Sequence, residues 1–366
     1  MSAFGGTSLE TFGLMNWVNP TRLITLCAVA AIAVGAPPLE SIAKSKRPPA
    51  VQEAPPPPPT PPGPVGLPSR LLADAGAYSA YLERVTATSP ASFTSGAAVS
   101  EALKTDAADD PDALIRGAVA YAAAAALQDS SFIAQIRAAG NSPENRQLMV
   151  GYIIRDPAYV FLFKGSDEAA GLAREALGSA GLRLLTAGKA VKQSAYEIQH
   201  QMWSKEEVAD RPGRLAAVKA SARAPMPPAE AREMELLQRV QTGAGSLGVT
   251  AAPAQPPYTT LVDRALQLAA IAALGEATDA AYDRLTVLTT DDSASTCLHI
   301  AKLNLYQCLA VAKPNYEDVF CLGQHVMADT GYCLAKNAGM AMPTEPPPPA
   351  AAPPEKVRGR HHAHAG

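Results

Sequence analysis

The segment from residue 297 to 333 holds four of the chain's five cysteines. Cys308 follows Cys297 by eleven positions. In an α-helix this spacing returns to within about 20° of the same face, but it leaves the two residues about 16 Å apart. A disulfide needs Cα atoms within about 7 Å of each other. These two cysteines therefore cannot bond to each other, and each needs a partner from another segment.

Lys313-Pro314 predicts a sharp turn in this segment, because the residue before a proline is pushed out of the helical region. An antiparallel helical hairpin then brings Cys308 beside Cys321 near the turn and Cys297 beside Cys333 at the open end. The twelve residues from Cys321 to Cys333 turn an α-helix about 120° away from the first face. We therefore expect the second helix to end near residues 329–331.

A metal site is the alternative for this segment, with Cys297, His299, Cys321 and His325 as ligands. Zinc sites usually bring two ligands within two to four residues of each other, and only the spacings C-x-H and C-x3-H are present here. The sequence therefore favours structural disulfides, with no metal or cofactor. Disulfides in turn indicate an oxidising compartment.

Residues 1–43 predict a signal peptide. Arg22 precedes an apolar run at 23–36, which is short for a membrane span of about 20 residues. Small residues at Ser41 and Ala43 suit a cleavage site. We expect a periplasmic or secreted protein, with membrane contact only if the signal is not cleaved and remains as an inner-membrane anchor.

The two ends of the chain are rich in proline, which lacks a backbone N–H and fixes φ. Residues 44–68 predict an extended proline-rich linker. Residues 341–366 predict a disordered tail rich in proline and histidine. Neither end is expected to join a folded core.

The chain between these ends predicts an all-α protein. Over 69–242 and 258–340, apolar residues recur at spacings of three and four. Serine or aspartate precedes several of these stretches, as is typical of helix N-termini. We expect a helical domain at 69–242, a loop at 243–257 and a helical segment carrying the four-cysteine hairpin at 258–340. Residues 158–165 favour a buried helix or an extended segment over a short strand.

Four glycines interrupt the long helical pattern that starts at Ser166, at positions 171, 178, 181 and 188. Glycine weakens a helix but allows close packing. We expect at least one break in this pattern.

Two local patterns resemble functional motifs. Residues 243–248 match G-x-G-x-x-G, but a dinucleotide-binding motif follows a strand and opens a helix, and this one follows a helix and runs into prolines. Adjacent carboxylates, at Asp109-Asp110 and Asp291-Asp292 for example, predict helix caps and solvated turns, because neighbouring residues on a helix point apart. We expect neither pattern to form a catalytic site.

A possible pocket involves His200 and Trp203, which lie three residues apart and would share a helix face. Tyr159 and Phe161 are its other candidate residues. A packed core patch is the competing interpretation. The formal net charge of −3 provides no field to attract nucleic acid, so we expect no nucleic-acid partner.

Three stretches carry a resemblance to a known set of proteins: GYIIRDPAYVF, GKAVKQSAYEIQHQMWSKEEVADRPGRLAAVK and CLAVAKPNYEDVFCLGQHVMADTGYC. They resemble uncharacterised exported proteins of alphaproteobacteria, over roughly residues 70–340. The resemblance implies a location in a Gram-negative cell envelope. It implies no activity, so no residue takes a role from it.

The sequence as a whole favours a non-enzymatic, exported module of the cell envelope, structural or interacting with an envelope protein or a cell-wall component. The alternative is a periplasmic helical protein that binds a small ligand. Proline-rich segments at both ends suit the first, and the possible pocket suits the second.

Overall fold

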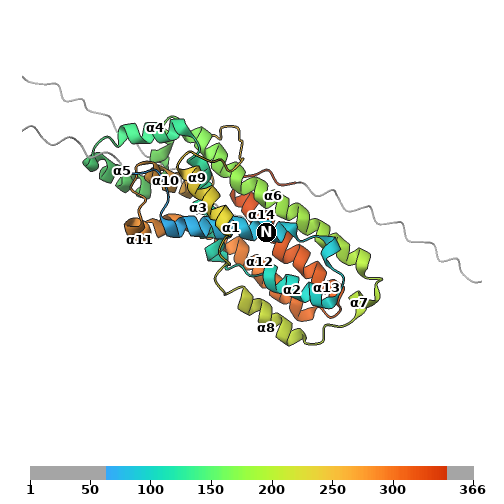
Figure 1. Ribbon diagram of the computed structural model, residues 1–366. Coiled ribbons are helices and arrows are strands. Elements are labelled where there is room, and N and C mark those ends of the chain that lie inside the picture. Colours follow the sequence, from blue (N-terminus) through green and yellow to red (C-terminus); the bar gives the residue numbers. More distant parts are fainter. Residues whose placement is uncertain (1–62, 344–366) are drawn as a thin grey trace, which may run out of the picture. The chain divides into compact units, whose positions relative to one another are not determined.

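The computed structural model describes residues 63–343, and within this range the chain is helical and contains no β-strand (Figure 1). This confirms the predicted all-α class. The predicted signal peptide and most of the linker and of the tail lie outside the described residues. The α-helices are α1 (Ser69–Ala87), α2 (Gly96–Asp106), α3 (Pro111–Ala126), α4 (Ser130–Ala139), α5 (Pro143–Arg155), α6 (Ser166–Ile198), α7 (Met202–Lys205), α8 (Arg211–Ser221), α9 (Ala231–Gln241), α10 (Thr260–Ala273), α11 (Tyr282–Leu285), α12 (Asp292–Val311), α13 (Asn315–Cys321) and α14 (Asp329–Asn337).

Shorter helical elements join these helices. Four are 3₁₀-helices and one is a π-helix: η1 (Pro90–Ser92), η2 (Pro157–Leu162), η3 (Asp279–Ala281), η4 (Thr286–Thr289) and the π-helix η5 (Leu322–Ala328). The segment expected to be a buried helix or extended, 158–165, lies mostly in η2, which starts at Pro157. Proline suits the first helical position because its missing N–H has no partner there in any case.

Side-chain caps start several helices where the sequence predicts them. Asp110 accepts a hydrogen bond from the backbone N–H of Ala113 at 2.9 Å, and Asp291 accepts one from Ala294 at 2.9 Å. Such caps satisfy N–H groups that have no partner within the helix. The expectation that Asp110 and Asp291 are caps is confirmed. Asp109 is different, because its carboxylate forms a buried ion pair.

The core is built around α3, which packs against α1, α6 and α10. Its run of alanines is fully buried, and small side chains let neighbouring helices approach closely. At Gly117, an added Cβ would lie 2.5 Å from the carbonyl oxygen of Asp74 in α1. The α10 helix follows the 243–257 loop in the chain and packs against α3, which precedes that loop. The helical segments on both sides of the loop therefore share one core.

The α6 helix runs without a break over 33 residues, so the expected break does not occur. The reason is that its glycines are contact points. Gly181 faces Gly331 of α14, and Gly188 faces Gly323 of η5, with backbone against backbone. A Cβ at Gly188 would overlap the backbone N of Ala328. The close contact between helices stabilises α6 where the intrinsic preference of glycine would weaken it.

Within residues 63–343, none of the helices combines the length and apolar character needed to cross a membrane.

The glycine contact predicts an asymmetric response to alanine. Gly188→Ala places a methyl group against backbone, so we expect a loss of about 2 kcal/mol or more in the free energy of unfolding. Gly151→Ala is the matched control, because it is also inside a helix but its nearest new neighbour is Arg155 Nη2 at 4.0 Å. There we expect a gain of about 0.5–1 kcal/mol. Urea unfolding followed by circular dichroism measures both; equal effects would contradict this account of the contact.

Candidate functional site

The four cysteines form the predicted nested pair of disulfides. Cys308 bonds to Cys321 and Cys297 bonds to Cys333, with Cα–Cα distances of 5.8 and 5.7 Å. The chain turns between the end of α12 at Val311 and the start of α13 at Asn315. Because all four sulfurs are in disulfides, they provide no thiolate for the alternative zinc site. His299 instead lies 3.6 Å from Asp112, and His325 lies 2.8 Å from Asp329.

The expectation that the second helix ends near residues 329–331 is wrong. The chain stays helical from Asn315 to Asn337 through α13, η5 and α14, which we call the composite helix. Its middle part, η5, is π-helical. A π-turn closes i→i+5 and so holds one residue more than an α-turn. The twelve residues from Cys321 to Cys333 therefore take the phase of about eleven α-helical ones, and both cysteines face α12.

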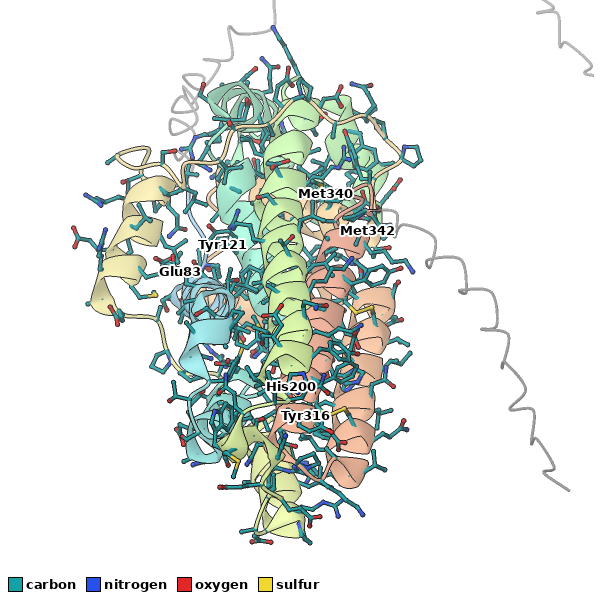
Figure 2. All side chains as sticks on the ribbon, turned by 90° about the vertical axis from the view of Figure 1, so that its right-hand side faces the viewer. Glu83, Tyr121, His200, Tyr316, Met340 and Met342 are labelled. Atoms are coloured by element: carbon teal, nitrogen blue, oxygen red, sulfur yellow. A yellow bond between two sulfur atoms is a disulfide. The ribbon has the colours of Figure 1, made fainter. Side chains whose placement is uncertain are left out.

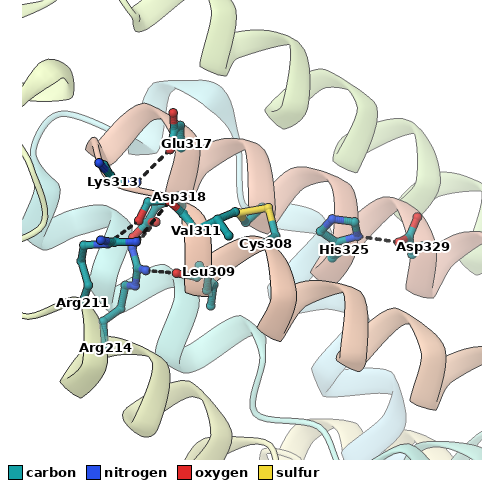
Figure 3. The surroundings of a disulfide bond; sticks show 12 residues. Arg211, Arg214, Cys308, Leu309, Val311, Lys313, Glu317, Asp318, His325 and Asp329 are labelled. Carbon is teal, nitrogen blue, oxygen red and sulfur yellow. Dashed lines mark hydrogen bonds and ion pairs between the residues drawn. A yellow bond between two sulfur atoms is a disulfide. The ribbon is translucent and has the colours of Figure 1, made fainter.

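Two arginines of α8 fasten the closed end of this hairpin (Figure 3). Arg211 donates hydrogen bonds to the carbonyls of Ala312 at 2.7 Å and Ala310 at 2.9 Å, at the C-terminal end of α12. Arg214 forms a buried ion pair with Asp318 and also donates to the Leu309 carbonyl. Cations are favourable at this end of a helix, where carbonyls lack partners. Burial raises the pKa of the Asp318 carboxyl, and Arg214 lowers it by a smaller amount.

A second buried ion pair joins α12 to the connection between α2 and α3. Lys302 contacts the carboxylate of Asp109 and donates a hydrogen bond to the Ala107 carbonyl at 2.9 Å. The expectation that Asp109 lies in a solvated turn is therefore wrong. A lysine 193 residues further along the chain cannot be inferred from local pattern, since it reaches Asp109 only through the packing of α12 on the core.

The four residues of the predicted pocket lie apart. Tyr159 and Phe161 belong to η2, just before α6, while His200 and Trp203 follow its last residue. Because α6 has 33 residues, the two pairs are about 50 Å apart along its axis. Figure 2 shows His200 near the C-terminal end of α6. The rings of Tyr159 and Phe161 instead pack against Tyr152 and Tyr258, at 5.4 and 4.9 Å between centroids.

A different cleft lies between α1, α3, α6 and the loop at 247–250, and we call it the tyrosine cleft. Its volume is about 600 Å³. Glu83 and Tyr121, which both line it, lie on the same side of α6 (Figure 2). The residues that matter for recognition are Tyr78, Ser79 and Glu83 of α1, Tyr121 of α3, and Glu175, Ser179 and Arg183 of α6.

Two neighbouring phenol rings, tilted by 48° to each other, form one wall of the tyrosine cleft. The rings of Tyr78 and Tyr121 lie 5.6 Å apart between centroids. Tyr78 is fully buried and its hydroxyl has no hydrogen-bond partner within the described residues. Burial raises the pKa of both tyrosines, while the charge of Arg183 acts in the opposite direction. Both side chains are therefore neutral hydroxyls, able to donate a hydrogen bond.

The loop at 243–257 forms the roof of the cleft and is held at both ends. Near its start, the backbone N–H of Leu247 donates to Gln128 Oε1 at 2.9 Å. Near its end, the N–H of Ala254 donates to the carbonyl of Asp167 at 2.9 Å. Gly248 has φ +67°, a conformation that favours glycine, and an added Cβ there would meet open space. The G-x-G-x-x-G stretch is therefore a loop, as predicted, and Gly248 lines the cleft.

The comparisons with known proteins give no relative: no family model, no curated protein and no solved structure matches this chain. The tyrosine cleft therefore has to be interpreted from its own residues.

Sequence reasoning missed this cleft, although part of its signal is visible. Glu175, Ser179 and Arg183 recur every fourth residue along α6 and so form one polar stripe. The contributions of α1, α3 and the loop depend on packing between segments far apart in the chain. Tyr78 and Tyr121 by themselves resemble ordinary core aromatics.

The π-turn explains the disulfide register and can be tested by deletion. Removing Gln324 leaves eleven residues from Cys321 to Cys333, which a regular α-helix accommodates with the same phase. We expect both disulfides to form. Peptide mapping of the unreduced protein by mass spectrometry identifies the pairs.

The control deletes Asn304 from α12, which is regular α-helix and has no extra residue to lose. This deletion rotates Cys297 by about 100° relative to Cys308, so we expect the Cys297–Cys333 bond to be lost and two thiols to be titratable. Loss of the same bond on deletion of Gln324 would contradict the role of the π-turn.

Proposed function

We propose that this protein is a non-catalytic binding protein of the cell envelope that takes a small ligand in the tyrosine cleft. The observation that carries the proposal is a cleft of about 600 Å³ lined by hydroxyls, two glutamates and an arginine. Ligand sites typically have volumes of about 300–1,000 Å³ and a few polar groups that converge on the ligand.

The composition of the wall favours binding over catalysis. The cleft-lining residues include hydroxyls, two glutamates and an arginine, but no histidine, cysteine or aspartate among the described residues. A general base beside a nucleophile is the usual arrangement for covalent or acid–base catalysis. Recognition through charge and hydrogen bonds is what these side chains support.

The location rests on the cysteines and on the sequence before the described residues. Two disulfides are characteristic of proteins that mature in an oxidising compartment. The predicted signal peptide at 1–43 supports export to the periplasm or beyond. Both point to ligands present in the envelope.

Filling the tyrosine cleft tests this function. A thermal-shift panel of envelope metabolites is expected to contain at least one compound that raises the melting temperature of the wild type. Ser179→Phe places a ring in the cleft and should abolish that shift. Thr186→Phe, on an exposed position of the same helix, is the matched control and should retain it. An equal response of both variants, or no response of the wild type, would contradict the proposal.

The predicted interaction module is a second candidate, favoured by the exposed face of α12. Ile300, Leu303 and Val311 are 52%, 56% and 73% exposed. The only charged residue between positions 300 and 311 is Lys302, which is buried. This exposed face of α12 is uncharged and partly apolar. It is therefore complementary to a partner protein of the envelope whose own contact surface is neutral and apolar.

Photo-crosslinking in intact cells distinguishes this candidate. A benzophenone residue in place of Leu303 is expected to capture one identified envelope protein, and Ile300→Asp should remove that product. The same residue in place of Glu144, exposed on α5, is the control and should capture nothing in common. Identical products from positions 303 and 144 would exclude a specific interface on α12.

A further inference from the structure

The α6 wall of the tyrosine cleft carries opposite charges at its two ends. Glu175, Ser179 and Arg183 all line the cleft, and their spacing of four residues places them on one face of the helix. Eight residues at about 1.5 Å each separate the glutamate from the arginine by about 12 Å along the axis. This distance is too long for a direct ion pair between them.

Neither charge is compensated within the described residues. Glu175 and Arg183 form no ion pair there, and the Arg183 guanidinium donates a hydrogen bond to Ser179 Oγ at 3.4 Å. The buried arginine Arg214 behaves differently, because it pairs with Asp318. The two ends of the cleft wall therefore offer an unpaired carboxylate and an unpaired guanidinium.

Neutral hydrogen-bond donors gather at the arginine end. Burial raises the pKa of the Tyr121 hydroxyl, the negative charges of Glu233 and Glu83 raise it further, and the positive charge of Arg183 lowers it. The Ser79 side chain lies beside this hydroxyl. Since burial keeps the Tyr121 phenol protonated, it can donate a hydrogen bond to an anion. A guanidinium with adjacent hydroxyl donors is well suited to a carboxylate.

We propose, on the basis of the proposed function, that the tyrosine cleft binds a short peptide of about three residues in an extended conformation. Its free carboxylate lies at Arg183 and its free ammonium group lies at Glu175. An extended chain spans at most about 3.3–3.6 Å per residue, so three residues cover about 10 Å, close to the rise of about 12 Å along the helix axis between Glu175 and Arg183. A single amino acid is too short to reach both.

A ligand of one charge fits this cleft less well. A simple anion at Arg183 would displace water from Glu175 without pairing with it, and a simple cation would do the same to Arg183. Desolvating an unpaired charge is strongly unfavourable. A ligand with both charges at opposite ends satisfies both side chains together.

The experiment uses trialanine as the probe and isothermal titration calorimetry on the full chain. N-acetyl-trialanine lacks the ammonium group, and trialanine amide lacks the carboxylate. We expect trialanine to bind the wild type and each blocked peptide to bind at least tenfold more weakly. Glu175→Gln should remove the loss caused by acetylation, and Arg183→Gln should remove the loss caused by amidation.

Glu197→Gln is the matched control, because Glu197 is exposed on the same helix and does not line the cleft. The preference for both free ends should persist in this variant. Circular dichroism melting of each variant confirms that it is folded. Loss of the ammonium preference in Glu197→Gln, or its persistence in Glu175→Gln, would overturn the orientation along α6, and with it the proposal.

Failure of trialanine to bind the wild type overturns the peptide proposal. The small-ligand function is judged separately, because a compound from the metabolite panel that stabilises the wild type but not Ser179→Phe still supports it. Equal binding of free and blocked peptides would show that the two charges do not select the ligand, and would also overturn the proposal.

Discussion

The backbone contact between α6 and the composite helix is the constraint on which the rest of the structure depends. Gly181 and Gly188 are seven residues apart, while their partners Gly331 and Gly323 are eight apart. Two regular α-helices could not match these spacings at both points. The extra residue of the π-turn in η5 lies between the two partner glycines, and it brings them to the spacing of α6. The same residue aligns Cys333 with Cys321, so one local irregularity serves two long-range contacts.

This contact also determines what the other side of α6 can do. The glycines occupy one face of the helix, and Glu175, Ser179 and Arg183 occupy the opposite face, because positions 179 and 181 differ by about 200° around the axis. The glycine face of α6 is thus held by backbone contact with the composite helix. The disulfides join the composite helix in turn to α12. The other face is held straight against α1 and α3, where it forms the wall of the tyrosine cleft. A break in α6 would have separated the two charges from their common face.

Local patterns in the sequence predict the helices, the caps at Asp110 and Asp291, the loop at 243–257 and the nested disulfides. These features depend on residues close together in the chain or on simple helical phase. The unbroken α6 and the π-turn were not predictable in this way. Glycine weakens an isolated helix, and only the facing glycines of a segment about 140 residues further along the chain turn that weakness into a contact.

The site was harder to predict than the fold for the same reason. His200 and Trp203 are close in sequence, but this does not bring them near Tyr159 and Phe161. The length of α6 keeps the two pairs far apart. The true neighbours of Tyr78 are Tyr121, Arg183 and the loop at 247–250, and packing alone brings these together. Residues that are close only in the folded structure cannot be grouped from their distance along the chain. The polar stripe on α6 can be recognised in the sequence once the helix is known to be continuous.

The structural sites of this molecule differ from its candidate binding site in whether their charged side chains form ion pairs. Two buried ion pairs, Arg214 with Asp318 and Lys302 with Asp109, compensate their own charges, because an unpaired buried charge would destabilise the fold. Glu175 and Arg183 stay near the surface, where water solvates them and folding requires no partner. The free energy cost arises only when another molecule displaces that water, so only a molecule that replaces both interactions can bind favourably. The feature that makes these charges neutral for stability is therefore the one that makes them selective for a ligand.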